Sequence, residues 1–203
     1  EDSTGSKGRM TPGDVQWMKT GRGIIHSEMP AMADGKLLGF QLWINMPAKM
    51  KMNKPKYDYI KANKIAQFKD ENKSLNIIAG KFENVEGPVK KHNVEPIFFD
   101  IELNDNKKIN LEVPKTHNSF VYLLKGDVKI GKNNTRKIND SNLVLLSRGT
   151  ELEVYANKKS RFLFIAGKPI GEQIARGGPF VMNTKQEILQ AVDDYQNGNF
   201  VKK

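Results

Sequence analysis

The stretch PIFFDIEL, residues 96–103, decides the fold of this chain. Phe99 and Ile101 share one face of a β-strand and Asp100 and Glu102 share the other, because successive side chains of a strand point to opposite faces. This alternation predicts a strand with one face in a hydrophobic core and the other in water.

Seven further segments have the same character: they are short, rich in β-branched or aromatic residues, and separated by turn signals such as Asn-Asn and Arg-Gly. They are residues 39–46, 74–80, 118–124, 126–131, 142–147, 151–156 and 161–167. Short strands at this spacing predict an all-β chain built as a sandwich or barrel. Trp17 and Trp43 lie in strand-like segments and are predicted to belong to the core.

Two stretches have helical features. Thr184 and Glu187 stand at capping-box spacing, and Gly198 is a plausible end of the helix that follows. One apolar face of this helix, predicted to pack in the core, comprises Ile188, Val192 and Tyr195. A weaker and more polar helix candidate covers residues 56–68 and is interpreted as a connector between two β units.

The chain is basic: 33 Lys and Arg against 23 Asp and Glu give a formal charge of +10. The lysines occur in pairs such as Lys90 and Lys91, in predicted loops without the interleaved aromatic residues of a base-stacking surface. We therefore expect solvated loop charge rather than direct nucleic-acid binding.

The residue content excludes several classes of site and location. There is no cysteine, which excludes disulfides and thiolate metal sites, and no apolar run approaches the length of a membrane span. We expect no membrane association and a cytoplasmic location, with a nuclear one as well in a eukaryote.

The segment GRGIIHSEMP, residues 21–30, carries the candidate site. Residues two apart on a strand face the same way, so His26 and Glu28 project together. Imidazole with carboxylate suits iron, manganese, nickel or zinc, and two or three His with one carboxylate is typical of Fe(II) oxygenases. The alternative, which the spacing alone favours, is that the two side chains bond only to each other or to the backbone.

Two donors cannot hold a metal ion, because at least one more protein ligand is required. The other histidines do not provide it: His92 lies in a charged loop and is predicted to be a surface residue, and His117 precedes a strand and is predicted to be structural.

Longer motifs identify the chain with a known family. GDVQWMKTGRGIIHSEMP (13–30), GFQLWINMP (39–47) and GGPFVMNTKQEI (177–188) resemble the pirin family, and FVYLLKGDVKIG (120–131) and FLFIAGKPI (162–170) extend the resemblance along essentially the whole chain. Pirins are two-domain members of the cupin superfamily.

The resemblance implies one iron in the N-terminal cupin, held by three His and one Glu. His26 and Glu28 match the last two of these ligands. The first two come from a His-x-His in an upstream HPHRG-like motif that this sequence does not contain. The expected cofactor is therefore Fe(II), one per N-terminal cupin, provided that the other two histidines are supplied from upstream of this chain.

Without the leading strands, the first barrel has open edges that invite aggregation. We therefore expect a separate N-terminal fragment to accompany the chain and complete this barrel. The alternatives are a second copy that covers the edges, or a partly disordered first unit.

The fold expected from the resemblance is two cupin jelly-roll units, the first incomplete, followed by a C-terminal helix. The expected ranges are 1–55 for the C-terminal part of the metal-binding cupin, 56–65 for a connector, 66–183 for a metal-free cupin and 184–203 for the helix and tail. When the cupin ligand pattern is anchored at Gly126, the second unit has Glu112, Pro114 and Ser119 at the ligand positions, a set without an imidazole.

The resemblance implies two functions of different classes. The first is an Fe(II)-dependent dioxygenase of the quercetin 2,3-dioxygenase type, in which His26 and Glu28 help to hold the iron and an aromatic small molecule such as a flavonol is the substrate. The second is a non-enzymatic, iron-dependent regulator that binds a transcription factor or a metabolic enzyme. The dioxygenase is favoured for the family, and activity of this chain depends on the missing ligands.

Overall fold

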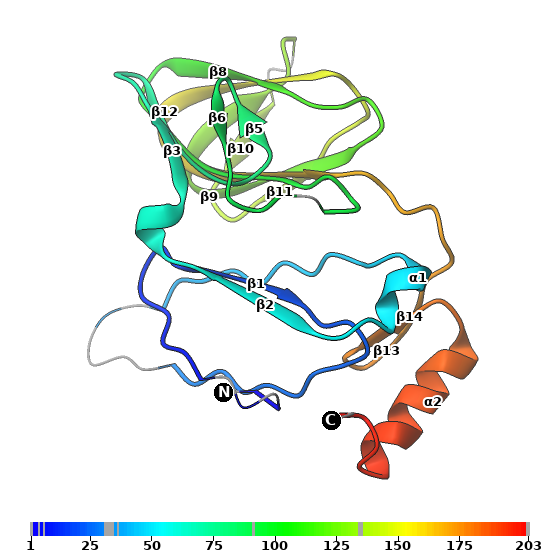
Figure 1. The fold of residues 1–203 in the computed structure, drawn as a ribbon. Helices are drawn as coiled ribbons and strands as arrows, with labels where there is room; N and C mark the ends of the chain where they lie inside the picture. The colour runs from blue at the N-terminus through cyan, green and yellow to red at the C-terminus, as the bar shows by residue number, and fades with distance from the viewer. Residues whose placement is uncertain are drawn as a thin grey trace. The chain divides into compact units, whose positions relative to one another are not determined.

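The computed structural model describes the chain apart from residues 1, 4, 6, 31–34, 36, 91, 134, 135, 202 and 203. The chain forms two compact units (Figure 1). One is continuous, Ile60–Pro169, and is called the second unit below. The other, the first unit, combines Glu1–Tyr59 with Ile170–Lys203.

This division differs from the expected one, in which residues 170–183 belong to the second cupin. The structure groups these residues with the N-terminal segment because hydrogen bonds tie the two together. Lys51 Nζ donates to the carbonyl of Val181 at 3.1 Å, and the backbone N–H of Ala48 donates to Glu172 Oε2 at 2.7 Å. The C-terminal segment is thus part of the unit that contains His26.

The second unit is built on an antiparallel sheet of eight strands in the order β10-β9-β12-β7-β4-β3, with β11 also paired to β9 and β8 to β12. These strands are β3 (Ala66–Lys69), β4 (Lys73–Ala79), β7 (Ile97–Leu103), β8 (Lys107–Glu112), β9 (Asn118–Ile130), β10 (Lys137–Asn139), β11 (Leu143–Leu145) and β12 (Glu151–Gly167). A short hairpin of β5 (Lys81–Phe82) and β6 (Val85–Glu86) and a 3-10 turn, η1 (Ala62–Lys64), complete the unit.

The longest strand, β12, belongs to two parts of the sheet, called its two walls below: one contains β8 and the other contains β7. Its residues Glu151–Ala156 pair with β8, its residues Ser160–Ala166 pair with β7, and β9 runs antiparallel to both parts. The register with β9 shifts at three places between Ala156 and Phe162, so the ladder is bulged there. Bulges bend a strand, and this one lets a single strand pass from one wall to the other.

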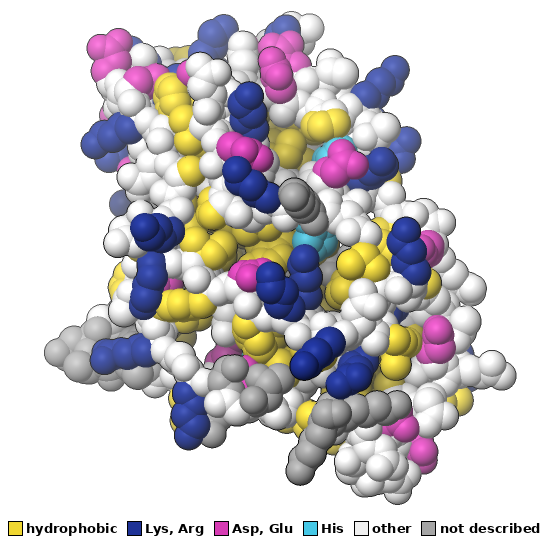
Figure 2. All heavy atoms as spheres, viewed as in Figure 1, with side chains coloured by type: hydrophobic (Ala, Val, Ile, Leu, Met, Phe, Trp, Pro, Cys, Tyr) yellow, Lys and Arg dark blue, Asp and Glu magenta, His cyan; other side chains and the backbone are white. Residues whose placement is uncertain are grey.

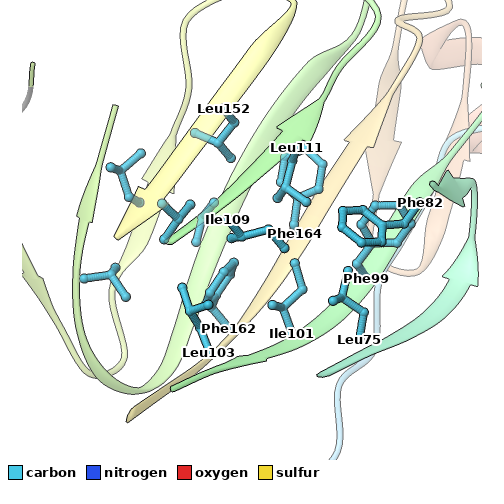
Figure 3. Close-up of a cluster of buried hydrophobic side chains, with 14 of the residues drawn as sticks. Leu75, Phe82, Phe99, Ile101, Leu103, Ile109, Leu111, Leu152, Phe162 and Phe164 are labelled. Atoms are coloured by element: carbon cyan, nitrogen blue, oxygen red, sulfur yellow. The ribbon is translucent and has the colours of Figure 1, made fainter. Parts of the chain in front are cut away.

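The core of the second unit lies between these walls. Figure 3 shows the buried aliphatic and aromatic side chains that point inward from β4, β7, β8, β9 and β12. Phe99 is 2% exposed and Phe164 is fully buried, with ring centroids 6.1 Å apart. Full burial of one such side chain contributes about 1.5–3 kcal/mol. β7 alternates buried and half-buried residues along its whole length, which confirms the prediction for residues 96–103.

The first unit has two strand pairs and two helices among its described residues. β1 (Val15–Lys19) pairs with β2 (Lys56–Ile60), and β13 (Ala175–Gly177) pairs with β14 (Phe180–Met182). The helices are α1 (Ala48–Lys51) and α2 (Lys185–Gln196). The predicted capping box of α2 is confirmed, since the side chains of Thr184 and Glu187 each accept a hydrogen bond from the other's backbone N–H.

Two predicted elements are wrong. Residues 39–46 were predicted to be a strand and form none, because they join no ladder among the described residues. Residues 56–68 were a helix candidate and instead contain β2, η1 and β3. Alternating Tyr57 and Tyr59 suit a strand, and pairing with β1 decides the outcome.

Three aromatic residues predicted to be core are more exposed than expected. Trp43 is 55% exposed, with the guanidinium of Arg176 over its ring at 5.7 Å, while Trp17 is half-buried in β1. On α2, Ile188 is buried as predicted, but Tyr195 is 53% exposed. Among the described residues, no helix is both long enough and apolar enough to span a bilayer.

Candidate metal-binding pair

A glycine turn shapes the segment that carries the candidate ligands. The N–H of Arg22 donates to the carbonyl of Asn53 at 2.8 Å. Gly21 has a φ of +52°, and a Cβ there would lie 3.0 Å from the carbonyl carbon of Asn53. Gly23, with a φ of +126°, also adopts a conformation that favours glycine. The GRG sequence is therefore explained by the backbone path that leads into His26.

The residues after this turn are held by the start of the chain. The N–H of Ser3 donates to the carbonyl of Ile25 at 2.7 Å, and the N–H of Ile25 donates to Ser3 Oγ at 3.1 Å. Asp2 and His26 form an isolated antiparallel bridge. The expected strand is thus reduced to a single bridge.

The structure brings the two predicted ligands together. His26 Nδ1 lies 3.6 Å from Glu28 Oε1, too far for a hydrogen bond and close enough for a charged pair when the imidazole is protonated. The His26 side chain is 29% exposed and that of Glu28 is 63% exposed. The Glu28 carboxylate therefore faces water.

Two further groups near this pair were not predicted. The pKa of the Tyr57 phenol is raised above its ordinary value. Burial is the largest cause, followed by the charge of Asp2, a hydrogen bond with Asp2 and the charge of Glu28. Tyr57 comes from β2 and Asp2 from the bridge with His26, so backbone pairing assembles an imidazole, two carboxylates and a phenol from three distant parts of the sequence.

The other two histidines lie in the second unit. His117 is 2% exposed; its Nε2 lies 2.9 Å from the carbonyl oxygen of Glu95 and its Nδ1 lies 3.3 Å from the hydroxyl of Thr116. These contacts agree with a structural histidine. His92 is half-buried, so it is less exposed than a surface residue was predicted to be, and its Nδ1 accepts a long hydrogen bond of 3.5 Å from the N–H of Val94.

Iron would need more donors than this pair provides. Within the part of the chain that the structure describes, no group of three or more His, Cys, Asp or Glu is arranged to hold a metal ion. Two donors fall below the three that a protein metal site requires. The described residues therefore do not form a complete iron centre by themselves. At the three positions of the second unit that match the cupin ligand pattern, Glu112 and Pro114 are exposed and Ser119 is half-buried.

The basic residues do not gather into one patch in the view of Figure 2, where lysine and arginine side chains are scattered among acidic ones on both units. Several are paired, for example Lys90 with Glu86 at 2.8 Å and Lys132 with Glu151 at 2.9 Å. Exposed pairs of this kind contribute little to stability.

Comparisons with known proteins decide the family. A family model described as pirin matches residues 1–44, and one described as the pirin C-terminal cupin domain matches residues 98–201. A pirin-like protein of Caulobacter vibrioides is 36% identical over 202 residues, which cover 98% of this chain and 72% of that protein. The chain belongs to the pirin family. Pirin of Homo sapiens is 36% identical over 200 residues, which cover 97% of this chain and 68% of the human protein.

Solved structures agree with this membership. A quercetin 2,3-dioxygenase from Acinetobacter baumannii is 31% identical to this pirin, with a TM-score of 0.84 over 98% of this chain and 71% of that one. A second structure with the same name and source, at 24% identity and a TM-score of 0.86, shares the fold. The all-β cupin fold with a C-terminal helix, expected from the sequence, is confirmed.

Proposed function

We propose that this pirin is a metal-dependent oxidoreductase of the quercetin 2,3-dioxygenase type, acting on an aromatic small molecule such as a flavonol. In this proposal His26 and Glu28 are two of the four protein ligands of one Fe(II). The other two are imidazoles from outside the described residues. The observation that carries the proposal is the His26–Glu28 pair, placed in the segment that matches the pirin family model.

The surroundings of the pair favour a cation. Glu28 Oε1 lies 3.6 Å from His26 Nδ1, and Asp2 is bridged to His26 through the backbone, so two acidic residues neighbour the imidazole. The 3.6 Å between His26 and Glu28 leaves these side chains without a hydrogen bond to each other, so both donor atoms can turn toward an ion. Imidazole with carboxylate is a donor set that suits Fe(II).

The first test measures iron by elemental mass spectrometry after incubation with Fe(II) under anaerobic conditions, with and without an excess of free imidazole. Free imidazole can provide the donors that the described residues lack. We expect iron to be retained with imidazole present, and this retention to be lost in His26→Ala and reduced in Glu28→Gln. His92→Ala, which removes an imidazole from the second unit, is the matched control and should retain the wild-type amount.

The second test measures quercetin consumption and O₂ uptake on iron-loaded protein. Turnover that His26→Ala abolishes and His92→Ala preserves would support the dioxygenase. Retention of iron without turnover would replace the dioxygenase with the non-enzymatic, iron-dependent regulator. Iron retention that does not depend on His26 would exclude the proposed ligand.

A further inference from the structure

Three aromatic side chains form a cluster at the C-terminal end of the first unit. Phe180 lies on β14, Tyr195 on α2, and Phe200 follows the helix. The ring centroid of Phe200 is 5.3 Å from that of Phe180 and 6.0 Å from that of Tyr195, and the third pair is 6.4 Å apart. All three contacts are edge-to-face, the geometry that aromatic rings prefer. The cluster fixes the position of Phe200.

The fixed ring of Phe200 lies against the glycine turn that leads to the candidate ligands. A Cβ built on Gly23 would stand 2.6 Å from Cε1 of Phe200 and even closer to Cζ. The tip of the ring thus occupies the space that any side chain at residue 23 would need. Because Gly23 is three residues before His26, this contact acts directly on the backbone that presents the imidazole.

A second route leads from the same C-terminal segment to the same turn. Val181 of β14 accepts the hydrogen bond of Lys51 in α1, and the N–H of Asn53, just past α1, donates to Met50 at 3.1 Å. The carbonyl of Asn53 then accepts the N–H of Arg22. The C-terminal segment therefore supports the turn on two sides, through Phe200 and through α1.

We propose that Phe200 is a positioning residue for the His26–Glu28 pair: by packing on Gly23 it holds the turn that sets the direction of both side chains. Ligand pairs depend on supports that fix their backbone and rotamers. The metal-binding role of the pair rests on the proposed function, whereas the positioning of the pair by Phe200 is independent of any metal.

The test uses two measurements on the intact, metal-free chain. Mass spectrometry measures amide hydrogen exchange peptide by peptide, and NMR measures the chemical shifts of the His26 ring. Phe200→Ala removes the ring. Phe200→Tyr adds a hydroxyl at Cζ, the atom nearest Gly23. Tyr195→Phe is the matched control, since it removes one hydroxyl from the exposed ring of the same cluster.

We expect exchange in residues 21–28 to become about tenfold faster in both Phe200 variants, with a shift of the His26 ring resonances. Tyr195→Phe and the second unit should remain unchanged. Phe200→Leu, which keeps apolar volume, should give a smaller acceleration and covers the case in which Phe200→Ala fails to fold.

Two results would overturn the proposal. One is unchanged exchange in residues 21–28 when Phe200 is altered. The other is an equal acceleration throughout the first unit with wild-type behaviour of Phe200→Tyr, which would mean a role in folding only. Failure of the iron test leaves this result unaffected, so the two proposals can fail separately.

Discussion

Gly126 lies so close to Ser160 that a Cβ added at residue 126 would stand 2.6 Å from the Cα of Ser160. The contact lies where the β9–β12 ladder is bulged. The N–H of Asp127 donates to Ser160 Oγ at 3.0 Å, which joins the two strands within the bulge. The passage of β12 from one wall to the other therefore depends on a residue without a side chain.

We expect Gly126→Ala to destabilise the second unit by about 3 kcal/mol, since it combines a left-handed φ of +117° with a collision against backbone. Gly171→Ala, in the first unit, is the control for backbone conformation alone: its φ of +73° is also unfavourable, but nothing lies within 4 Å of the added Cβ. The control should cost about 1 kcal/mol. Urea unfolding checks both, and equal costs would show that the contact with Ser160 contributes nothing.

The outer face of the second unit carries a polar row across neighbouring strands. Arg161 donates to both oxygens of Asp100, from Nε at 2.9 Å and from Nη2 at 2.8 Å, and Asn76 donates to the same carboxylate at 3.3 Å. The Asp100 side chain is only 13% exposed. Two parallel hydrogen bonds from a guanidinium make this a stronger pair than a surface contact.

Arg161→Lys should destabilise the second unit by about 1 kcal/mol, because an ammonium cannot reproduce the two-pronged geometry and Asp100 is largely removed from water. Lys159→Ala is the control, as Lys159 lies 3.9 Å from Glu102 with both side chains exposed, and should change stability by less than about 0.5 kcal/mol. The same unfolding experiment in low and high salt checks this. If the destabilisation by Arg161→Lys disappears in high salt, the Arg161–Asp100 pair contributes no more than an ordinary surface ion pair.

The strands of the second unit could be predicted because the alternation of apolar and polar residues is a local property. Residues 96–103 alone indicate β7. The lengths of β9 and β12 could not. Gly126 and the Asn157–Ser160 region look like turn signals, yet each lies inside one continuous strand. A bulged ladder carries the pairing through these residues, and bulge pairing depends on the opposite strand.

In the candidate site, too, the local feature could be predicted from the sequence and the long-range ones could not. The proximity of His26 and Glu28 follows from a spacing of two in extended backbone, and it survives although only a bridge forms there. Asp2 and Tyr57 could not be found, since pairing between distant segments brings them in. The role of residues 56–60 as a strand, which places Tyr57, depends on the same pairing.

The last prediction concerns the capping box of α2 and acid. Hydrogen bonds from the backbone N–H groups of Thr184 and Asn183, and from the Thr184 hydroxyl, lower the pKa of Glu187 below its ordinary 4.5. A carboxyl with a lower pKa in the folded state stabilises the fold above the unfolded-state pKa. This stabilisation is lost as the pH falls through the folded-state value. We therefore expect the acid loss of α2 stability to begin below about pH 4.5.

Glu187→Gln can still cap the helix, so it should reduce this pH dependence while preserving much of the helix at neutral pH. Thr184→Ala should cost about 1 kcal/mol at neutral pH, and Thr184→Ser, which keeps the hydroxyl, should cost much less. Hydrogen exchange of α2 between pH 3 and 7, corrected for the intrinsic rate, measures all three. An identical pH profile in wild type and Glu187→Gln would assign the acid sensitivity of the helix to another carboxyl.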